Sequence, residues 1–349
     1  MPTFARSFAT HVLQEWDAKN PGNAVRALFG HWCLPGIAAS GKLGLRLGLR
    51  SGYLNFYIKG QSIARLSIAR NGPRLSIHKA YVTPRRRKTE ADGTPPTQDY
   101  QTYDARALAD PDTAGLIPGW IETAKTYASA EKCFVDDLIA ANPGVIDLEM
   151  GLPASNLEGS ERVAPRMDLV LAQRKGDEPL SIGFWEAKCA NNSELRASGN
   201  KAAKVVEQIA KYARWMAQGD RMAEVQDAYR SAACTLLEMN RLFREREGNP
   251  ECVGIWQALA ELETPGVMVQ PGIVIGNYWP EGYQQTVASG RMAQCAASFA
   301  RNGHRDKLRV TGIRVFEVGP DHHGPVLPFL AGAAPENAAQ RAQIEGTLK

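Results

Sequence analysis

Apolar and polar residues alternate from Gly41 to Val82, the period of a β-strand with one buried face. The alternation runs through residues 41–50, 53–59, 63–69 and 74–82, and glycine-containing turns separate these runs. Residues 8–19, before them, have helical periodicity instead. The pattern therefore predicts a helix followed by an antiparallel meander of about four strands.

The rest of the chain mixes helical periodicity with short apolar runs. We predict a helix over residues 129–140, a strand over 144–150 and a hairpin whose strands cover 165–173 and 180–188. Further helices are expected over 195–216, 224–247 and 291–301, and further strands over 266–276 and 310–318. Strands and helices in this order favour an α/β fold with helices packed on the sheet.

Length and composition set the domain organisation. With 349 residues, 44% of them hydrophobic, the chain can bury a sizeable core. We predict a basic β-meander domain at residues 1–95, an α/β domain at 96–330 and a flexible Ala-rich tail at 331–349. No apolar run is long enough to cross a membrane, and the first residues do not resemble a signal peptide, so we expect a cytoplasmic protein.

The predicted hairpin carries two carboxylates and an amine. Asp168 interrupts the apolar run of the first strand, and Glu186 and Lys188 share one face of the second. A carboxylate in an apolar strand needs a partner or a metal ion. The structural alternatives are a turn cap at Asp168 and an exposed ion pair between Glu186 and Lys188. Convergence of the three side chains would favour a hydrolytic site for Mg²⁺ or Mn²⁺, which prefer oxygen ligands.

Two neighbouring helices add candidate residues. Gln208 and Tyr212 are four residues apart and so share one helical face, although they could be ordinary polar positions. Glu131, on the helix before the hairpin, is one candidate for a third metal ligand. The other acids that compete for this role are Asp136, Asp137 and Glu149.

Together these residues resemble the PD-(D/E)xK nuclease superfamily, and the Gln208–Tyr212 spacing matches the QxxxY element of its RecB-like branch. The resemblance covers about residues 130–215, and Pro165 stands three residues before Asp168 instead of next to it. It implies a mixed-sheet, restriction-endonuclease-like core with helices on both faces. It also implies that Asp168, Glu186 and Glu131 hold Mg²⁺ or Mn²⁺, that Lys188 orients or activates the attacking water, and that Gln208 and Tyr212 complete the catalytic set.

The N-terminal quarter of the chain is strongly basic. Residues 1–88 contain fifteen Lys or Arg and two acidic residues, a net charge of +13. Such a region is typical of polyanion binding. We predict phosphate contacts from the meander and from the cationic run that follows it, at Lys42, Arg46, Arg50, Arg85, Arg86, Arg87 and Lys88.

The expected function is a metal-dependent nuclease that hydrolyses DNA, with a role in DNA repair or in defence against foreign DNA. The sequence contains no Walker A motif, so a helicase or ATPase would be a separate partner subunit. The alternative is a nucleic-acid-binding or partner-docking subunit in which the nuclease-like core is structural.

Overall fold

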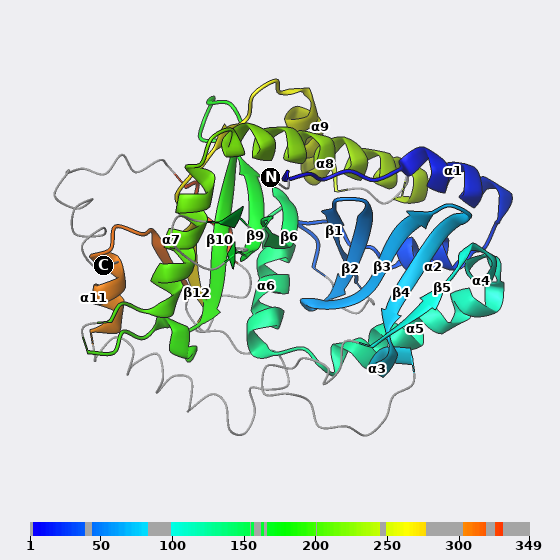
Figure 1. Ribbon diagram of the computed structural model, residues 1–349, viewed down its shortest axis with the longest axis horizontal. Helices are drawn as coiled ribbons and strands as arrows, with labels where there is room; N and C mark the ends of the chain where they lie inside the picture. The colour runs from blue at the N-terminus through cyan, green and yellow to red at the C-terminus, as the bar shows by residue number, and fades with distance from the viewer. Residues whose placement is uncertain are drawn as a thin grey trace.

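The computed structural model describes residues 3–38, 44–82, 99–153, 155–156, 162–163, 166–199, 201–244, 249–276, 303–318 and 325–330. They form a mixed α/β fold in which two main sheets lie side by side with helices packed around them (Figure 1). The predicted α/β class is therefore confirmed at this level. The helix predicted over 291–301 and the tail at 331–349 lie outside the described residues.

The first sheet is an antiparallel meander with its strands in chain order. Its strands are β1 (Arg46–Arg50), β2 (Tyr53–Ile58), β3 (Gln61–Ala69), β4 (Gly72–His78) and β5 (Tyr100–Tyr103). The first four confirm the predicted meander, although the strand predicted over 74–82 ends at His78, because Lys79–Val82 form a helix. Because β5 pairs with β4, the sheet extends beyond residue 95, where the first domain was predicted to end. At four residues, β5 is too short to show a clear period in the sequence.

Helices cover one face of the first sheet. They are α1 (Thr10–Lys19), α2 (Ala24–Gly30), α3 (Lys79–Val82), α4 (Ala105–Ala109) and α5 (Pro111–Lys125). Asp104 and Asp110 cap α4 and α5, each accepting a hydrogen bond from a first-turn N–H. The apolar side chains of β2, β3 and β4 point toward these helices, and Phe56 meets Phe29 of α2 with ring centroids 5.1 Å apart.

The second sheet is mixed, with the strand order β13-β12-β10-β9-β6. The strands are β6 (Val145–Gly151), β9 (Arg166–Gln173), β10 (Ser181–Cys189), β12 (Gly272–Gly276) and β13 (Val315–Val318), and β11 (Gly266–Val267) also pairs with β10. Strands β6, β9 and β10 are antiparallel neighbours, which confirms the predicted hairpin, whereas β12 and β13 run parallel to β10. A short ribbon of β7 (Ser155–Asn156) and β8 (Arg162–Val163) stands apart.

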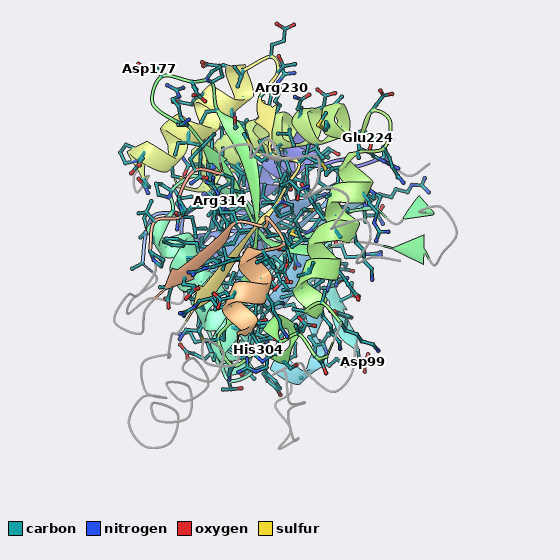
Figure 2. The ribbon with its side chains drawn as sticks, turned by 90° about the vertical axis from the view of Figure 1, so that its left-hand side faces the viewer. Asp99, Asp177, Glu224, Arg230, His304 and Arg314 are labelled. Atoms are coloured by element: carbon teal, nitrogen blue, oxygen red, sulfur yellow. The ribbon has the colours of Figure 1, made fainter. Side chains whose placement is uncertain are left out.

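Helices lie against both faces of β10. These helices are α6 (Ala130–Ala141), α7 (Lys204–Met216) and α8 (Arg221–Arg244), and α9 (Pro250–Glu261) and α11 (His304–Arg309) flank the sheet. Phe184 packs against Tyr212 of α7, with ring centroids 4.8 Å apart. Trp185, on the opposite face, is buried in a cluster with Phe134 of α6. In Figure 2 the β9–β10 turn with Asp177 is at the top of the molecule and α11 with His304 is near the bottom.

Other predicted elements also differ in their bounds, and the helix expected from residue 224 begins at Arg221. The helix expected from residue 195 begins at Lys204, after a single 3₁₀ turn at Ser193–Leu195. The strand expected over 266–276 is divided into β11 and β12, and Pro271 between them has no N–H for a ladder hydrogen bond. The strand expected from residue 310 begins at Val315, because α11 and a turn at Gly312, with φ of 73°, precede it.

One hydrophobic cluster continues from the first sheet into the second. It contains Phe56 and Leu66 of the meander together with Met150 and Phe184 of the second sheet. The two sheets are thus packed on a shared core, a coupling that the contrast in composition did not indicate. No helix in the described ranges has the length and apolarity needed to cross a bilayer.

Candidate catalytic site at the ends of three strands

The strand register places one carboxylate on each of three neighbouring strands. The pairing of β9 with β10 leads from Leu169 and Trp185 to the next pair, Asp168 and Glu186. The pairing of β6 with β9 sets Glu149 opposite Asp168 in the same way. These three residues, called the carboxylate row below, lie toward the end of the second sheet away from the β9–β10 turn.

Lys188 lies two residues after Glu186, on the same face of β10. Its Nζ is 2.8 Å from Glu186 Oε1, 3.2 Å from Glu194 Oε2 and 3.7 Å from Glu131 Oε1. Burial alone lowers the pKa of Lys188, but the carboxylates of Glu186, Asp168 and Glu131 outweigh it and raise the pKa above its ordinary value. The ammonium group therefore stays charged at neutral pH.

The two hairpin carboxylates have raised pKa values. Burial raises the pKa of Asp168 well above its ordinary range, and the charges of Glu186 and Glu149 raise it further. Lys188 opposes this, as does the N–H of Ala187, which donates to Asp168 Oδ2 at 2.8 Å. Burial raises the pKa of Glu186 to about 7 against the pull of Lys188. The row therefore contains more buried carboxyl groups than the neighbouring ammonium could neutralise if all of them were ionised.

Glu131 reaches this site from the first turn of α6. Its Oε2 accepts hydrogen bonds from the backbone N–H of Cys189, at 3.3 Å, and from the side-chain amide of Asn192, at 2.8 Å. These bonds hold the chain that leaves β10. Its role as a metal ligand stays a prediction, and Glu149 is the competing acid that the register brings beside Asp168.

Glu194 is a site residue that the sequence reasoning missed. It lies in the 3₁₀ turn after β10, where Asn192 caps the turn by accepting from the Glu194 N–H at 2.8 Å. Its carboxylate is closer to Lys188 Nζ than that of Glu131. The available signal was an Asn191-Asn-Ser-Glu194 segment just after the strand, a composition typical of capped turns.

Gln208 and Tyr212 lie on α7, against the same face of the sheet as the row. Tyr212 is fully buried against Phe184, which is two residues before Glu186 on β10. Burial, followed by the neighbouring Tyr229, raises the pKa of Tyr212 well above its usual range. The Tyr212 hydroxyl and Gln208 Oε1 are both buried, and neither has a hydrogen-bond partner within the described ranges. Buried polar atoms without a partner are uncommon in folded proteins.

The donor set fits a hard divalent cation. No three His, Cys, Asp or Glu side chains of the described residues converge closely enough to enclose a metal ion by themselves. Mg²⁺ does not need such a cage, because it is usually held by one or two carboxylates together with water and substrate phosphate. Asp168 and Glu186 are two adjacent carboxylates with incomplete charge compensation, which is the chemistry such an ion requires.

The structure corrects the prediction of phosphate contacts at Arg46 and Arg50. Both side chains are buried, at 1% and 8% residue exposure. Arg46 Nε bonds Asp136 Oδ1 at 3.0 Å, and Arg50 Nη1 bonds Asp147 Oδ1 at 2.5 Å. The alternation of Leu and Arg indicated which side chains point away from the meander core. It did not indicate that β1, the edge strand that carries them, packs against α6 and β6. The other predicted contacts, Lys42, Arg85, Arg86, Arg87 and Lys88, lie outside the described residues.

Arg50 belongs to a buried group that we call the Asp147 network. Arg6 Nε bonds Asp147 Oδ2 at 3.0 Å, and the Tyr229 hydroxyl donates to the same oxygen at 3.2 Å. The backbone N–H of Leu148 donates to Oδ1 at 2.8 Å. The network thus joins the N-terminal segment, β1, β6 and α8 around one carboxylate.

The Asp147 network also fixes the backbone at Glu149. Arg50 Nη2 donates to the carbonyl of Leu148, to that of Glu149 at 3.1 Å and to the Tyr57 hydroxyl at 3.0 Å. Glu149 has a φ of 49°, in the left-handed region that residues with a side chain rarely adopt. The bonds from Arg50 hold this conformation in place, so the meander helps to set one end of the carboxylate row.

Comparison of the chain with models of protein families, with curated proteins and with solved structures finds no match in any of the three. Interpretation of the site therefore depends on its geometry and electrostatics, together with the resemblance of its motifs.

Proposed function

We propose that the protein is a metal-dependent nuclease that hydrolyses phosphodiester bonds of DNA. The observation that supports this most directly is the position of Asp168 opposite Glu186, with Lys188 on the same face and with both carboxyl pKa values raised. Perturbed acids that converge with an amine are typical of sites that act on a charged substrate.

In this proposal Asp168 and Glu186 hold Mg²⁺ or Mn²⁺. When bound, the ion supplies a water of lowered pKa and neutralises negative charge on the phosphate. Deprotonated carboxylates are required to bind it, so the raised pKa of Glu186 makes binding favourable only as the pH approaches and passes about 7. Glu149, opposite Asp168, is the further acid available to the same site.

Lys188 acts electrostatically in the proposed reaction. Because its pKa is raised, it keeps its proton and does not serve as the base that deprotonates water. Its ammonium group, positioned by Glu186 and Glu194, can stabilise negative charge that develops on the substrate phosphate. It can also orient the attacking water by donating a hydrogen bond.

DNA as substrate, and a role in repair or in defence against foreign DNA, follow from the resemblance to the RecB-like branch. A helicase or ATPase is proposed as a separate partner because the sequence contains no Walker A motif.

One observation favours the alternative, a nucleic-acid-binding or partner-docking subunit with a structural core. Lys188 forms a 2.8 Å ion pair with Glu186, so a protein group already provides part of the compensating charge at this position. In a purely structural core that pair would be permanent and no cation would be required. The two proposals differ in whether an added divalent metal ion enables the protein to cleave DNA.

A cleavage assay tests the proposal. Circular and linear DNA are incubated with the protein in Mg²⁺ or in EDTA, beside Glu186→Gln and a matched control, Glu178→Gln. Glu178 is exposed in the β9–β10 turn, so its replacement makes the same charge change away from the site. We expect cleavage in Mg²⁺ alone, its loss in Glu186→Gln and its retention in Glu178→Gln. Equal cleavage by both variants would remove Glu186 from the mechanism.

A further inference from the structure

The face of the first sheet that the described helices leave uncovered is polar, and the strands that form it carry no acidic residue. Residues 44–82 and 100–103, which include every strand of this sheet, contain no Asp or Glu. The side chains that alternate with the buried ones on β2 to β5 and are not themselves buried form what we call the open face: Tyr53, Arg65, Ser67, Arg74, Ser76, Tyr100 and Thr102. Its charge is therefore positive, since Arg65 has no acid beside it on these strands.

An exposed arginine lies between two aromatic rings at the centre of this face. The Arg65 guanidinium carbon is 5.2 Å from the ring centroid of Tyr100 and 5.9 Å from that of Tyr53. Both rings are half-buried, so their positions are fixed while part of each surface meets solvent. Two fixed aromatic rings with a guanidinium group between them provide stacking surfaces for unpaired bases together with a positive charge for phosphate.

The open face leads to the carboxylate row. Arg50 pairs with Tyr53 in the β1–β2 register, and its guanidinium donates to the Glu149 carbonyl. Tyr57, on the same side of β2 as Tyr53, is close enough to Glu149 for that charge to contribute to its raised pKa. Glu149 in turn lies opposite Asp168. One end of the face therefore adjoins the site proposed for hydrolysis.

We infer that the open face binds a single-stranded polynucleotide and directs it toward the Glu149 end of the carboxylate row. A duplex would hide its base faces from Tyr53 and Tyr100, so the two rings would contribute no stacking to its binding. An acidic protein would match the charge but would gain little from the paired rings. The direction of the strand rests on the proposed nuclease function, whereas the binding itself does not.

Binding measured in EDTA separates this inference from catalysis. The full-length protein is titrated against fluorescently labelled 20-nucleotide single-stranded DNA, RNA of the same sequence and the corresponding DNA duplex. The variants are Tyr100→Leu, Arg65→Ala and the control Arg106→Ala. Arg106 is an exposed cation on α4, on the helical side of the same sheet, so its loss makes an equal charge change elsewhere. Thermal melting verifies that each variant is folded.

We expect the single strand to bind more tightly than the duplex. Loss of one stacking contact should weaken single-strand binding by Tyr100→Leu about 5-fold to 100-fold, the range for removing a base-stacking ring. The salt dependence of binding by Tyr100→Leu should stay that of the wild type, because no phosphate contact is lost. Arg65→Ala should weaken binding as well, and Arg106→Ala should bind within about twofold of wild type, since its charge lies away from the face.

Folded Tyr100→Leu and Arg65→Ala variants that bind as the wild type does would overturn the inference, as would equal affinity for the duplex. Competition by polyglutamate as effective as that by the single strand would assign the face to an acidic protein instead and would also overturn it. If Tyr100→Leu fails to fold, Tyr100→Phe, which keeps the ring, should bind normally, and Arg65→Ala then decides the matter.

The outcome is independent of the hydrolysis test. Specific single-strand binding without Mg²⁺-dependent cleavage would support the open face and reject the nuclease. Mg²⁺-dependent cleavage by a protein in which neither Tyr100 nor Arg65 contributes to single-strand binding would support the nuclease and reject the open face. Tighter binding of RNA than of DNA would support the face as a single-strand site and would overturn DNA as the substrate.

Discussion

Two buried charged groups in this protein are built in opposite ways. In the Asp147 network both carboxylate oxygens are hydrogen-bonded and two guanidinium groups surround the single acid. In the carboxylate row, Asp168 and Glu186 share one ammonium group with Glu131 and Glu194. The network has spare positive charge, whereas the row has spare negative charge.

This difference separates a structural role from a proposed chemical one. A buried acid with a full set of donors is already satisfied, and removing it would leave cations without a partner. Buried acids with raised pKa values are destabilised as they stand and gain from a further cation. The predictions below test the difference from the largest expected effect to the smallest.

Asp168→Asn should abolish cleavage while making the protein more stable. Loss of a positioned charged group at the reaction centre typically costs at least about 10²-fold in rate. Because the Asp168 pKa is raised by burial and by neighbouring acids, replacement with neutral Asn should raise the melting temperature at pH 8. Cleavage and thermal melting are measured on the same preparation. A variant that is both active and less stable would contradict the assignment.

Asp147→Asn should have the opposite effect on stability. It leaves Arg6 and Arg50 buried without their acid, a change that typically costs about 3 to 5 kcal/mol. Urea denaturation measures the free energy of unfolding, with Asp227→Asn, an exposed residue of α8, as the matched control. If Asp147→Asn were no less stable than that control, the network would not have the structural role assigned to it.

The pH dependence of stability should show the raised pKa of Glu186. The folded state binds a proton more tightly than the unfolded state, whose pKa is near 4.5, so the stability from this group is complete below about pH 4.5. It is lost as the pH rises through about 7, and the loss amounts to about 3 kcal/mol at most. Thermal melts from pH 4 to 8 measure the slope, and Glu186→Gln should flatten it. Mg²⁺-dependent cleavage should rise over the same interval.

Gln208→Ala should lower activity with little change in melting temperature. Its Oε1 is buried without a hydrogen-bond partner in the described part of the chain, so the side chain contributes little to stability as it stands. If Gln208 positions the substrate strand or Lys188, cleavage should fall by about tenfold, the lower end for a group that acts through another. A large loss of stability with unchanged specific activity would identify Gln208 as a packing residue.

The hairpin set could be predicted from the sequence because its geometry is local. Two residues on one strand share a face, and a short turn brings Asp168 beside them. The same reasoning failed for Arg46 and Arg50, whose partners are 90 and 97 residues away in the chain. An alternating pattern identifies the side chains that point away from one core. It does not show whether these side chains are exposed to solvent or packed against a second sheet.

Glu149 and Glu194 show the same limit within the site. The position of Glu149 depends on a bulge in β6 and on a left-handed backbone that Arg50 holds from another sheet. Glu194 reaches Lys188 from an irregular turn that has no periodic signal. Strand periodicity therefore predicted that Asp168, Glu186 and Lys188 lie together, whereas the positions of Glu149 and Glu194 depend on tertiary packing.

The most direct test of the central claim is calorimetric titration of the protein with Mn²⁺ at pH 6.5, in two buffers of different ionisation enthalpy. Our account predicts that the ion binds to the wild type and releases protons, because Glu186, whose pKa is raised to about 7, is partly protonated at this pH. Asp168→Asn should bind much more weakly. Binding that is absent, that releases no protons or that is unchanged in Asp168→Asn would contradict the claim that the carboxylate row is a metal site.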